Sequence, residues 1–315
     1  MTKDVSIIIV NLNDQHHLEE CLTSIYKHTQ ECIFEVIVVD NHSSDDSVAV
    51  VKTKFPQVRL IENTSNNRYA IANNQGLEIA TGKYVLYLNG DTVLLGNVVQ
   101  AMADFLEGQE DAGAVGCQLI YPDGSQQDAC FRFPSAVNLC YLLCLARFYW
   151  KTRLAGNYLF QNLTTPQQVD FVIGACLMAR REILVKCQGM NPEYYFYGED
   201  SDLCYRIRKA GWNIYHLPKS EHVMHYGGVS STLNLFDNNQ RIKYLWGWKS
   251  RFLFVKKHYP RGYKLLILLA VLLGFGVNVL LYSLSFCKRR DWEYTRRNLQ
   301  AHWEITREAF SIFER

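Results

Sequence analysis

Two short acidic segments carry most of the chemistry that this sequence could perform. The first is Asn89-Gly90-Asp91, directly after an apolar run, where the glycine permits a tight bend. A carboxylate held there can bind a hard cation such as Mg²⁺ or Mn²⁺, which takes oxygen ligands from carboxylates and substrate phosphates. Because Asn-Gly-Asp is also common in turns, metal binding and a structural turn both remain open for this segment.

The second acidic segment contains Glu199, Asp200 and Asp202. It precedes a predicted helix, so the acids could simply cap that helix, with Asp202 and Arg206 forming an i,i+4 pair. Capping explains Glu199 and Asp200 less well, because aromatic residues at 194–197 come directly before them. An aromatic wall can desolvate a carboxylate and raise its pKa toward the range of a general base.

A histidine completes the set of candidate chemical groups. His225 stands two residues before Gly227-Gly228, and a ring nitrogen beside a glycine turn could bind a metal ion. The alternative is a structural histidine held by hydrogen bonds.

The elements that must position these residues follow from apolar runs that alternate with helical patterns. Such alternation predicts a parallel sheet with right-handed crossovers, which binds ligands outside the carboxyl ends of its strands. Asn11, Asp40 and Asp91 each follow a predicted strand, so we expect them at one edge. Strands are predicted over 5–10, 34–39, 58–61, 84–88, 114–120 and 171–179, and helices over 18–25, 48–55, 69–80, 98–106, 137–150 and 201–210.

Composition and missing motifs exclude several classes of protein. The chain has 33 Lys and Arg against 31 Asp and Glu, a balance that does not indicate a nucleic-acid partner. Ten scattered cysteines without a CxxC pair indicate reduced thiols in the cytosol. The absence of GxGxxG, GxxxxGK[ST] and GxSxG disfavours a dinucleotide site, a P-loop and an α/β-hydrolase.

The strongest change in composition comes late in the chain. Residues 265–287 contain no charged side chain, and as a helix they would be about 35 Å long, enough for a hydrocarbon core of about 30 Å. Basic residues flank both ends, so the positive-inside rule gives no orientation. We expect membrane contact, with a spanning helix and an in-plane helix both open, and a soluble core helix as the alternative.

Taken in order, these segments resemble the family 2 inverting glycosyltransferases with the GT-A fold, above all the rhamnosyltransferase-like branch that builds bacterial polysaccharides. The resemblance spans about residues 5–260, and its most specific part is the Glu-Asp segment. The matching segments are Ser6–Asn13 with Val36–Asp45, Asn66–Gly76 with Leu88–Thr92, Gly174–Arg181 with Tyr195–Trp212, and His225–Ser230.

The resemblance and the apolar tail together predict the architecture. We expect an α/β chain with a GT-A-like, mostly parallel sheet flanked by helices and a C-terminal helical, membrane-associated tail. Residues 1–125 would form the nucleotide-sugar-binding half, 126–255 the acceptor-binding and catalytic half, and 256–315 the tail.

The resemblance also implies a role for each candidate residue. Asp200 would be the catalytic base, with Glu199 as its competitor, and Asp91 and His225 would serve a divalent cation, Mg²⁺ or Mn²⁺. The nucleotide-diphosphate sugar donor would be held by Asn11 and Asp40 at the base and ribose, and by Arg68, Asn73 and Asn89 toward the diphosphate.

Two positions depart from the family pattern. Asn89 replaces the first acid of the family's DxD motif, and Arg68-Tyr69 stands where relatives usually carry a Gly-Phe type pair.

The expected reaction is transfer of a sugar, with L-rhamnose from dTDP-rhamnose as the expected donor, to a lipid-linked glycan at the cytoplasmic face of the inner membrane. Arg132 and Arg147 stand beside apolar residues and would face that acceptor. One alternative is a nucleotidyltransferase, which would need basic residues after the first strand, where the sequence is Asn11-Leu-Asn-Asp-Gln. The other alternative is a non-enzymatic, membrane-anchored interaction protein.

Overall fold

The computed structural model describes residues 4–144, 164–218, 222–227, 238–289 and 292–314. Contacts divide the chain into two compact units, which we call the sheet unit and the helical unit. The sheet unit comprises 1–132, 160–193 and 199–229, and the helical unit comprises 133–159, 194–198 and 230–315. The expected boundaries at residues 125 and 255 separate segments by the ligand that each would bind. These boundaries stay a prediction.

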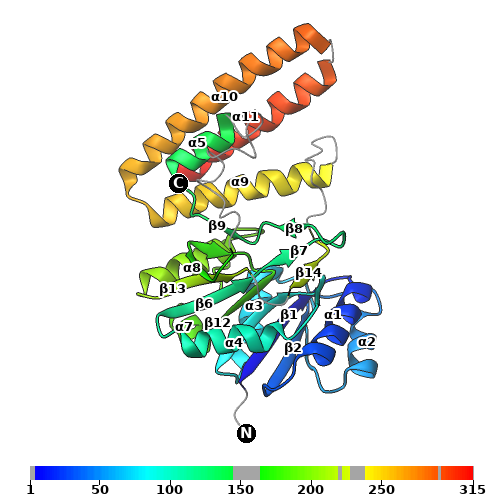
Figure 1. The fold of residues 1–315 in the computed structure, drawn as a ribbon. Helices are drawn as coiled ribbons and strands as arrows, with labels where there is room; N and C mark the ends of the chain where they lie inside the picture. The colour runs from blue at the N-terminus through cyan, green and yellow to red at the C-terminus, as the bar shows by residue number, and fades with distance from the viewer. Residues whose placement is uncertain (1–3, 145–163, 219–221, 228–237, 290–291, 315) are drawn as a thin grey trace. The chain divides into compact units, whose positions relative to one another are not determined.

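An eight-stranded sheet forms the centre of the sheet unit (Figure 1). The neighbouring strands β4, β1, β2 and β3 are parallel, as is the pair β6 and β13, whereas β12 and β10 run antiparallel to their neighbours. The expected mostly parallel α/β sheet is thus confirmed. In order, the strands are β10 (Gln167–Val169), β13 (Asn213–Leu217), β6 (Ala112–Cys117), β12 (Cys176–Arg180), β4 (Tyr84–Asn89), β1 (Val5–Asn11), β2 (Phe34–Asp40) and β3 (Arg59–Glu62).

Both faces of this sheet are buried, which is why its central strands are continuous apolar runs. In β1, Ile7 and Ile9 point into a core shared with α1, α2 and α4, and Ile8 lies against Gly76 of α3 on the other face. The helices are α1 (Gln15–His28), α2 (Ser47–Lys54), α3 (Arg68–Ile79), α4 (Val98–Gly108), α7 (Arg181–Lys186) and α8 (Glu199–Lys209).

Two of the predicted strands differ from the structure. The strand expected over 114–120 ends at Cys117, and Leu119 begins a strand of another sheet. The strand expected over 171–179 is likewise two strands, separated at residues 173–175. The sequence predicted apolar runs correctly but could not reveal where the backbone leaves one sheet for another.

Two small sheets lie beside the main one. Their strands bring segments far apart in the sequence next to one another, notably residues 92–94 and 223–225. The first is β11 (Phe171–Val172) with β9 (Cys130–Phe131), and the second is β5 (Thr92–Leu94), β14 (Val223–His225), β7 (Leu119–Ile120) and β8 (Gln126–Gln127), in that order.

The described part of the helical unit consists mainly of long helices. In Figure 1, α10 and α11 run side by side, and α5 lies against α10. These three helices share an apolar cluster with α9, and it includes Leu139, Phe252, Ile267 and Ile305, all nearly fully buried. Of the helix expected over 137–150, α5 covers the part up to residue 144, and the rest lies outside the described residues. The helices are α5 (Ala136–Cys144), α9 (Asn238–His258), α10 (Arg261–Arg289) and α11 (Trp292–Glu314).

Candidate active site

The carboxyl ends of three adjacent strands form one edge of the candidate site. Asn11 ends β1 and Asp40 ends β2, and the register pairs these two residues directly. Asn89 ends β4, on the other side of β1. Because parallel strands end at the same edge, polar residues that follow separate apolar runs are brought together.

Asn11 and Asp40 form a buried polar cluster with Ser43. The Asn11 Nδ2 atom donates to Asp40 Oδ1 at 3.0 Å and to Ser43 Oγ at 3.1 Å. The Ser43 amide and hydroxyl donate to the two Asp40 carboxylate oxygens at 2.8 and 2.6 Å. Asn11 Oδ1 is buried and has no hydrogen-bond partner within the described residues, so it can accept a hydrogen bond from a ligand.

The start of α3 carries the two other predicted donor-binding residues. Arg68 is exposed, and its φ of 68° is in the left-handed region, where a non-glycine residue is uncommon. Asn73 is buried, and its side-chain amide donates to the backbone oxygen of Tyr69 at 3.0 Å. Asn73 therefore secures the first turn of α3, and its contact with a donor stays a prediction.

Asp91 and His225 lie in direct contact. The antiparallel pair β14 and β5 sets His225 opposite Thr92, next to Asp91. His225 Nε2 is 3.3 Å from Asp91 Oδ1 and 3.4 Å from Asn89 Nδ2. Its other ring nitrogen lies 3.1 Å from Gln127 Oε1, which orients the ring.

His225 stabilises the ionised form of Asp91. Burial by itself would raise the pKa of Asp91, but the hydrogen bond and charge of His225 outweigh it and hold the pKa below its usual value. Gly227 keeps the space in front of the pair open, because a Cβ there would lie 2.6 Å from Asp91 Oδ2 and 2.7 Å from His225 Nε2.

This pair fits only part of a metal coordination shell. The described residues contain no group of three His, Cys, Asp or Glu side chains that could hold an ion. One carboxylate and one imidazole instead suit a cation whose remaining ligands are water and substrate phosphates.

Glu199 and Asp200 begin α8 and differ in their hydrogen bonds. Asp200 accepts from the backbone N–H groups of Gly174 at 3.1 Å and Ser201 at 2.7 Å. Glu199 Oε2 is buried without a partner in the described chain. Burial and the neighbouring Asp200 charge raise the pKa of Glu199, and burial raises the pKa of Asp200, although its two amide donors favour the charged form. At neutral pH the pKa of about 8 therefore favours the protonated form of Glu199.

Tyr69 joins the two acidic segments, and the sequence analysis gave it no role. Its hydroxyl lies 2.9 Å from Asn89 Oδ1 and 3.2 Å from the backbone oxygen of Gly174. Gly174 in turn donates to Asp200, so Asp91, His225 and Asp200 belong to one connected network. Tyr69 stands where the sequence departs from the family pattern, and that departure could have identified it as a candidate site residue.

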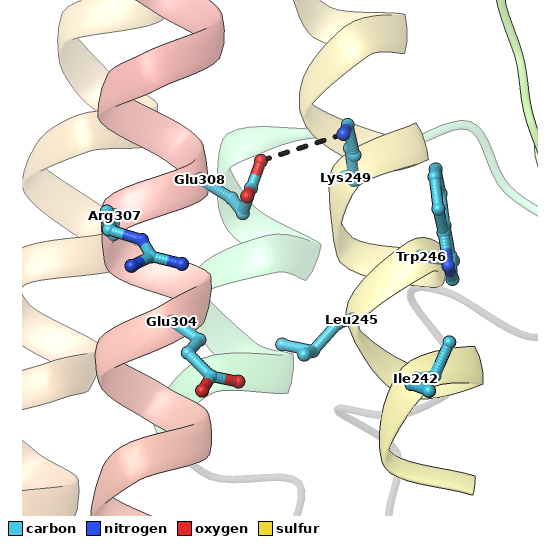
Figure 2. Close-up of a pocket in the computed structure, with 7 residues that line it drawn as sticks. All are labelled: Ile242, Leu245, Trp246, Lys249, Glu304, Arg307 and Glu308. Atoms are coloured by element: carbon cyan, nitrogen blue, oxygen red, sulfur yellow. Dashed lines mark ion pairs between the residues drawn. The ribbon is translucent and has the colours of Figure 1, made fainter. Parts of the chain in front are cut away.

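The acceptor-facing roles expected for Arg132 and Arg147 stay predictions. Arg132 is exposed at the end of the sheet unit, and Arg147 lies outside the described residues. A pocket that the sequence did not predict lies wholly in the helical unit, between α9 and α11 (Figure 2). One of its lining residues, Trp246, stacks on Tyr195 with ring centroids 4.2 Å apart. Its lining residues are Ile242, Leu245, Trp246, Lys249, Glu304, Arg307 and Glu308.

Two curated relatives of this chain are rhamnosyltransferases. It is 27% identical to the N-acetylglucosaminyl-diphospho-decaprenol L-rhamnosyltransferase of Mycobacterium tuberculosis, over 73% of this chain and 78% of that protein. It is 23% identical to the rhamnosyltransferase WbbL of Escherichia coli K12, over 70% of this chain and 83% of that protein.

Solved structures and family domains agree with these relatives. The mannosyltransferase PcManGT of Pyrobaculum calidifontis, solved with GDP-Man and Mn²⁺, has the same fold, with a TM-score of 0.58 and 17% identity over 99% of this chain and 87% of that one. Residues 159–227 match the family described as the N-terminal domain of galactosyltransferase. Residues 6–187, more than half of the chain, match glycosyl transferase family 2. The chain therefore belongs to glycosyl transferase family 2 and is a glycosyltransferase with a GT-A-like fold.

Proposed function

We propose that this enzyme transfers L-rhamnose from dTDP-rhamnose, with inversion, to a polyprenyl-diphosphate-linked saccharide at the cytoplasmic face of the inner membrane. The observation that carries the proposal is the network that links Asp91 and His225 to Asp200 through Asn89 and Tyr69. The activities named for the relatives in Mycobacterium tuberculosis and Escherichia coli support the donor sugar, and the first supports the lipid-linked acceptor. Residues 11–15, which follow β1, contain no Lys or Arg, so the sequence there does not favour a nucleotidyltransferase.

Asp200 would act as the base. It would take the proton of an acceptor hydroxyl while that oxygen attacks the anomeric carbon and the bond to the nucleotide diphosphate breaks, a role that contributes about 10²–10⁴ in rate. A single displacement inverts the anomeric carbon and needs no second carboxylate as nucleophile. The buried Asn11 and Asp40 cluster would hold the nucleoside, and Arg68 would lie toward the diphosphate.

Asp91 and His225 would hold Mg²⁺ or Mn²⁺. When bound, the cation would neutralise charge that develops on the diphosphate leaving group. The Mn²⁺ in the structure of the mannosyltransferase neighbour supports this choice of ion class.

A thermal-shift titration tests both the donor and the metal. We expect dTDP-rhamnose with Mn²⁺ to raise the melting temperature by mass action. Asp91→Ala should weaken this binding about 100-fold with the metal present, since it removes a charged ligand. The exposed Asp104→Ala serves as the matched control and should bind normally. Equal donor affinity with and without a chelator would remove the metal from the mechanism, and a response only to other nucleotide sugars would contradict the donor.

A further inference from the structure

The outward face of α10 consists almost entirely of leucine. The exposed fractions of these side chains range from 46% to 61%, and their spacing of three, four or seven residues along most of the row keeps them on one side of the helix. We call this set the leucine face: Leu265, Leu266, Leu269, Leu272, Leu273, Leu280 and Leu284. Exposed apolar area of this extent marks a surface that binds a partner.

The opposite face of α10 is fixed against the protein. Gly274 lies against Leu143 of α5 so closely that a Cβ would be 2.6 Å from the Leu143 Cβ. Asn278 is buried and donates to the backbone oxygen of Leu143 at 2.6 Å. Tyr282 donates to Asn298 of α11 at 3.0 Å. These contacts hold the leucine face outward.

The partner helix α11 argues against α10 crossing a membrane. The two helices pack along one another, so a spanning α10 would carry α11 into the hydrocarbon. α11 has charged side chains along its length, and each is strongly unfavourable in a bilayer core. They are Glu293, Arg296, Arg297, Glu304, Arg307, Glu308 and Glu314.

The charge of the surrounding sequence indicates what covers the leucine face. Residues 238–290 contain eleven Lys and Arg and no Asp or Glu, although the whole chain carries a net charge of only +2. Trp303, which is 53% exposed, contacts Phe275 beside the leucine face with ring centroids 5.9 Å apart. Basic residues around an apolar face bordered by tryptophan are typical of helices that lie in the surface of an anionic membrane.

We propose that the leucine face lies in the plane of an anionic lipid bilayer, with both ends of α10 on the same side of the membrane. This contact would bring the enzyme proposed above to its lipid-linked acceptor, so its biological role rests on the proposed function. The observations that support the contact do not depend on that function. A second copy of the chain is the competing occupant of this face.

Flotation of the full chain with vesicles tests the contact. Vesicles of phosphatidylglycerol should bind the protein, and vesicles of phosphatidylcholine should bind it at least tenfold more weakly. The double change Leu269→Gln and Leu273→Gln should weaken binding at least tenfold, whereas Leu95→Gln, a leucine of the sheet unit with 47% exposure, should leave it unchanged. Unchanged binding of the double variant would overturn the proposal, as would a lipid-free dimer that the same changes dissociate.

Protease access to tags at the two ends of the chain tests the orientation. In inverted membrane vesicles we expect both tags to be cleaved, and tags on opposite sides would show that α10 spans. Vesicle binding requires neither donor nor acceptor, so failure here leaves sugar transfer intact. Failure of transfer to a soluble acceptor analogue would likewise leave the membrane contact intact. Thermal unfolding followed by circular dichroism, which needs no donor, confirms that each variant is folded.

Discussion

The sheet unit buries the apolar side chains of its central strand, whereas the helical unit leaves a row of leucine side chains exposed. In the sheet unit, Ile7, Ile8 and Ile9 of β1 are completely buried, because helices cover both faces of the sheet. In the helical unit, Leu265 and Leu273 of α10 are 61% and 58% exposed. The first unit thus completes its own core and presents polar groups at its strand ends, whereas the second keeps apolar surface for a partner. Changes in one unit should therefore leave the function of the other intact.

The largest expected effect is the loss of transfer on changing the base in the sheet unit. Asp200→Asn should lower kcat by about 10³, because the amide cannot accept the acceptor's proton. Donor binding by calorimetry and vesicle binding should stay normal. Glu199→Gln is the matched control and should retain activity within about tenfold, since this side chain is expected to be neutral already. The opposite pattern would assign the base to Glu199.

A second test concerns acid stability, which we expect to depend on the sheet unit. Burial of Glu35 would raise its pKa, but hydrogen bonds from Ser6, Thr81 and Arg59 outweigh burial and lower the pKa to about 2. Because this value is below the unfolded one of about 4.5, the stabilisation is complete above pH 4.5 and is lost as the pH falls toward 2.

Glu35→Gln should therefore destabilise the sheet unit by roughly 2–3 kcal/mol at pH 7 and by much less at pH 3. Urea denaturation at the two pH values measures the difference. Glu110→Gln, at an exposed position, should leave the free energy of unfolding unchanged at both pH values. If Glu35→Gln lowered the free energy of unfolding equally at both pH values, Glu35 would not act through its charge.

Paired glycine substitutions on α10 test the helical unit alone. Gly274→Ala should destabilise it by about 1–3 kcal/mol through overpacking against Leu143. Gly276→Ala meets no neighbour within 4 Å and should stabilise the helix by up to about 1 kcal/mol. Thermal unfolding followed by circular dichroism distinguishes the two, and the response to donor should be the same in both. Similar effects of the two changes would contradict the close packing of α5 on α10.

The smallest expected effect concerns the link between the acidic segments. Tyr69→Phe removes the hydroxyl that lies between Asn89 and Gly174, and we expect kcat to fall about tenfold, the equivalent of one hydrogen bond. Tyr87→Phe is the control, because the Tyr87 hydroxyl is buried without a partner in the described part of the chain. That change should leave kcat unaltered and stabilise the protein slightly. If Tyr69→Phe and Tyr87→Phe lowered kcat equally, the hydroxyl of Tyr69 would have no specific positioning role.

Local patterns predicted much of the fold. The apolar runs that became β1, β2 and β4 were predicted to within one residue and the helices between them to within three, because burial of the strands on both faces leaves a strong pattern in the sequence. The long helix α9 was missed, and α11 was expected only as part of a helical tail over 256–315, without bounds of its own. Their apolar positions are interspersed with Trp, Tyr, Arg and Glu, which hides the helical period in the sequence.

The sequence by itself determined the family, the central strands and the acidic residues at their ends, because these depend on neighbours a few positions away. Only the tertiary structure decided that His225 lies against Asp91, since the strand pair that joins them brings residues 223–225 next to residues 92–94. It also assigned Tyr69 its place between Asn89 and Gly174. For α10, composition left spanning, in-plane and soluble-core arrangements open. The packed, charged α11 favours the second, because burial of charge in lipid depends on which helices pack together and not on one segment alone.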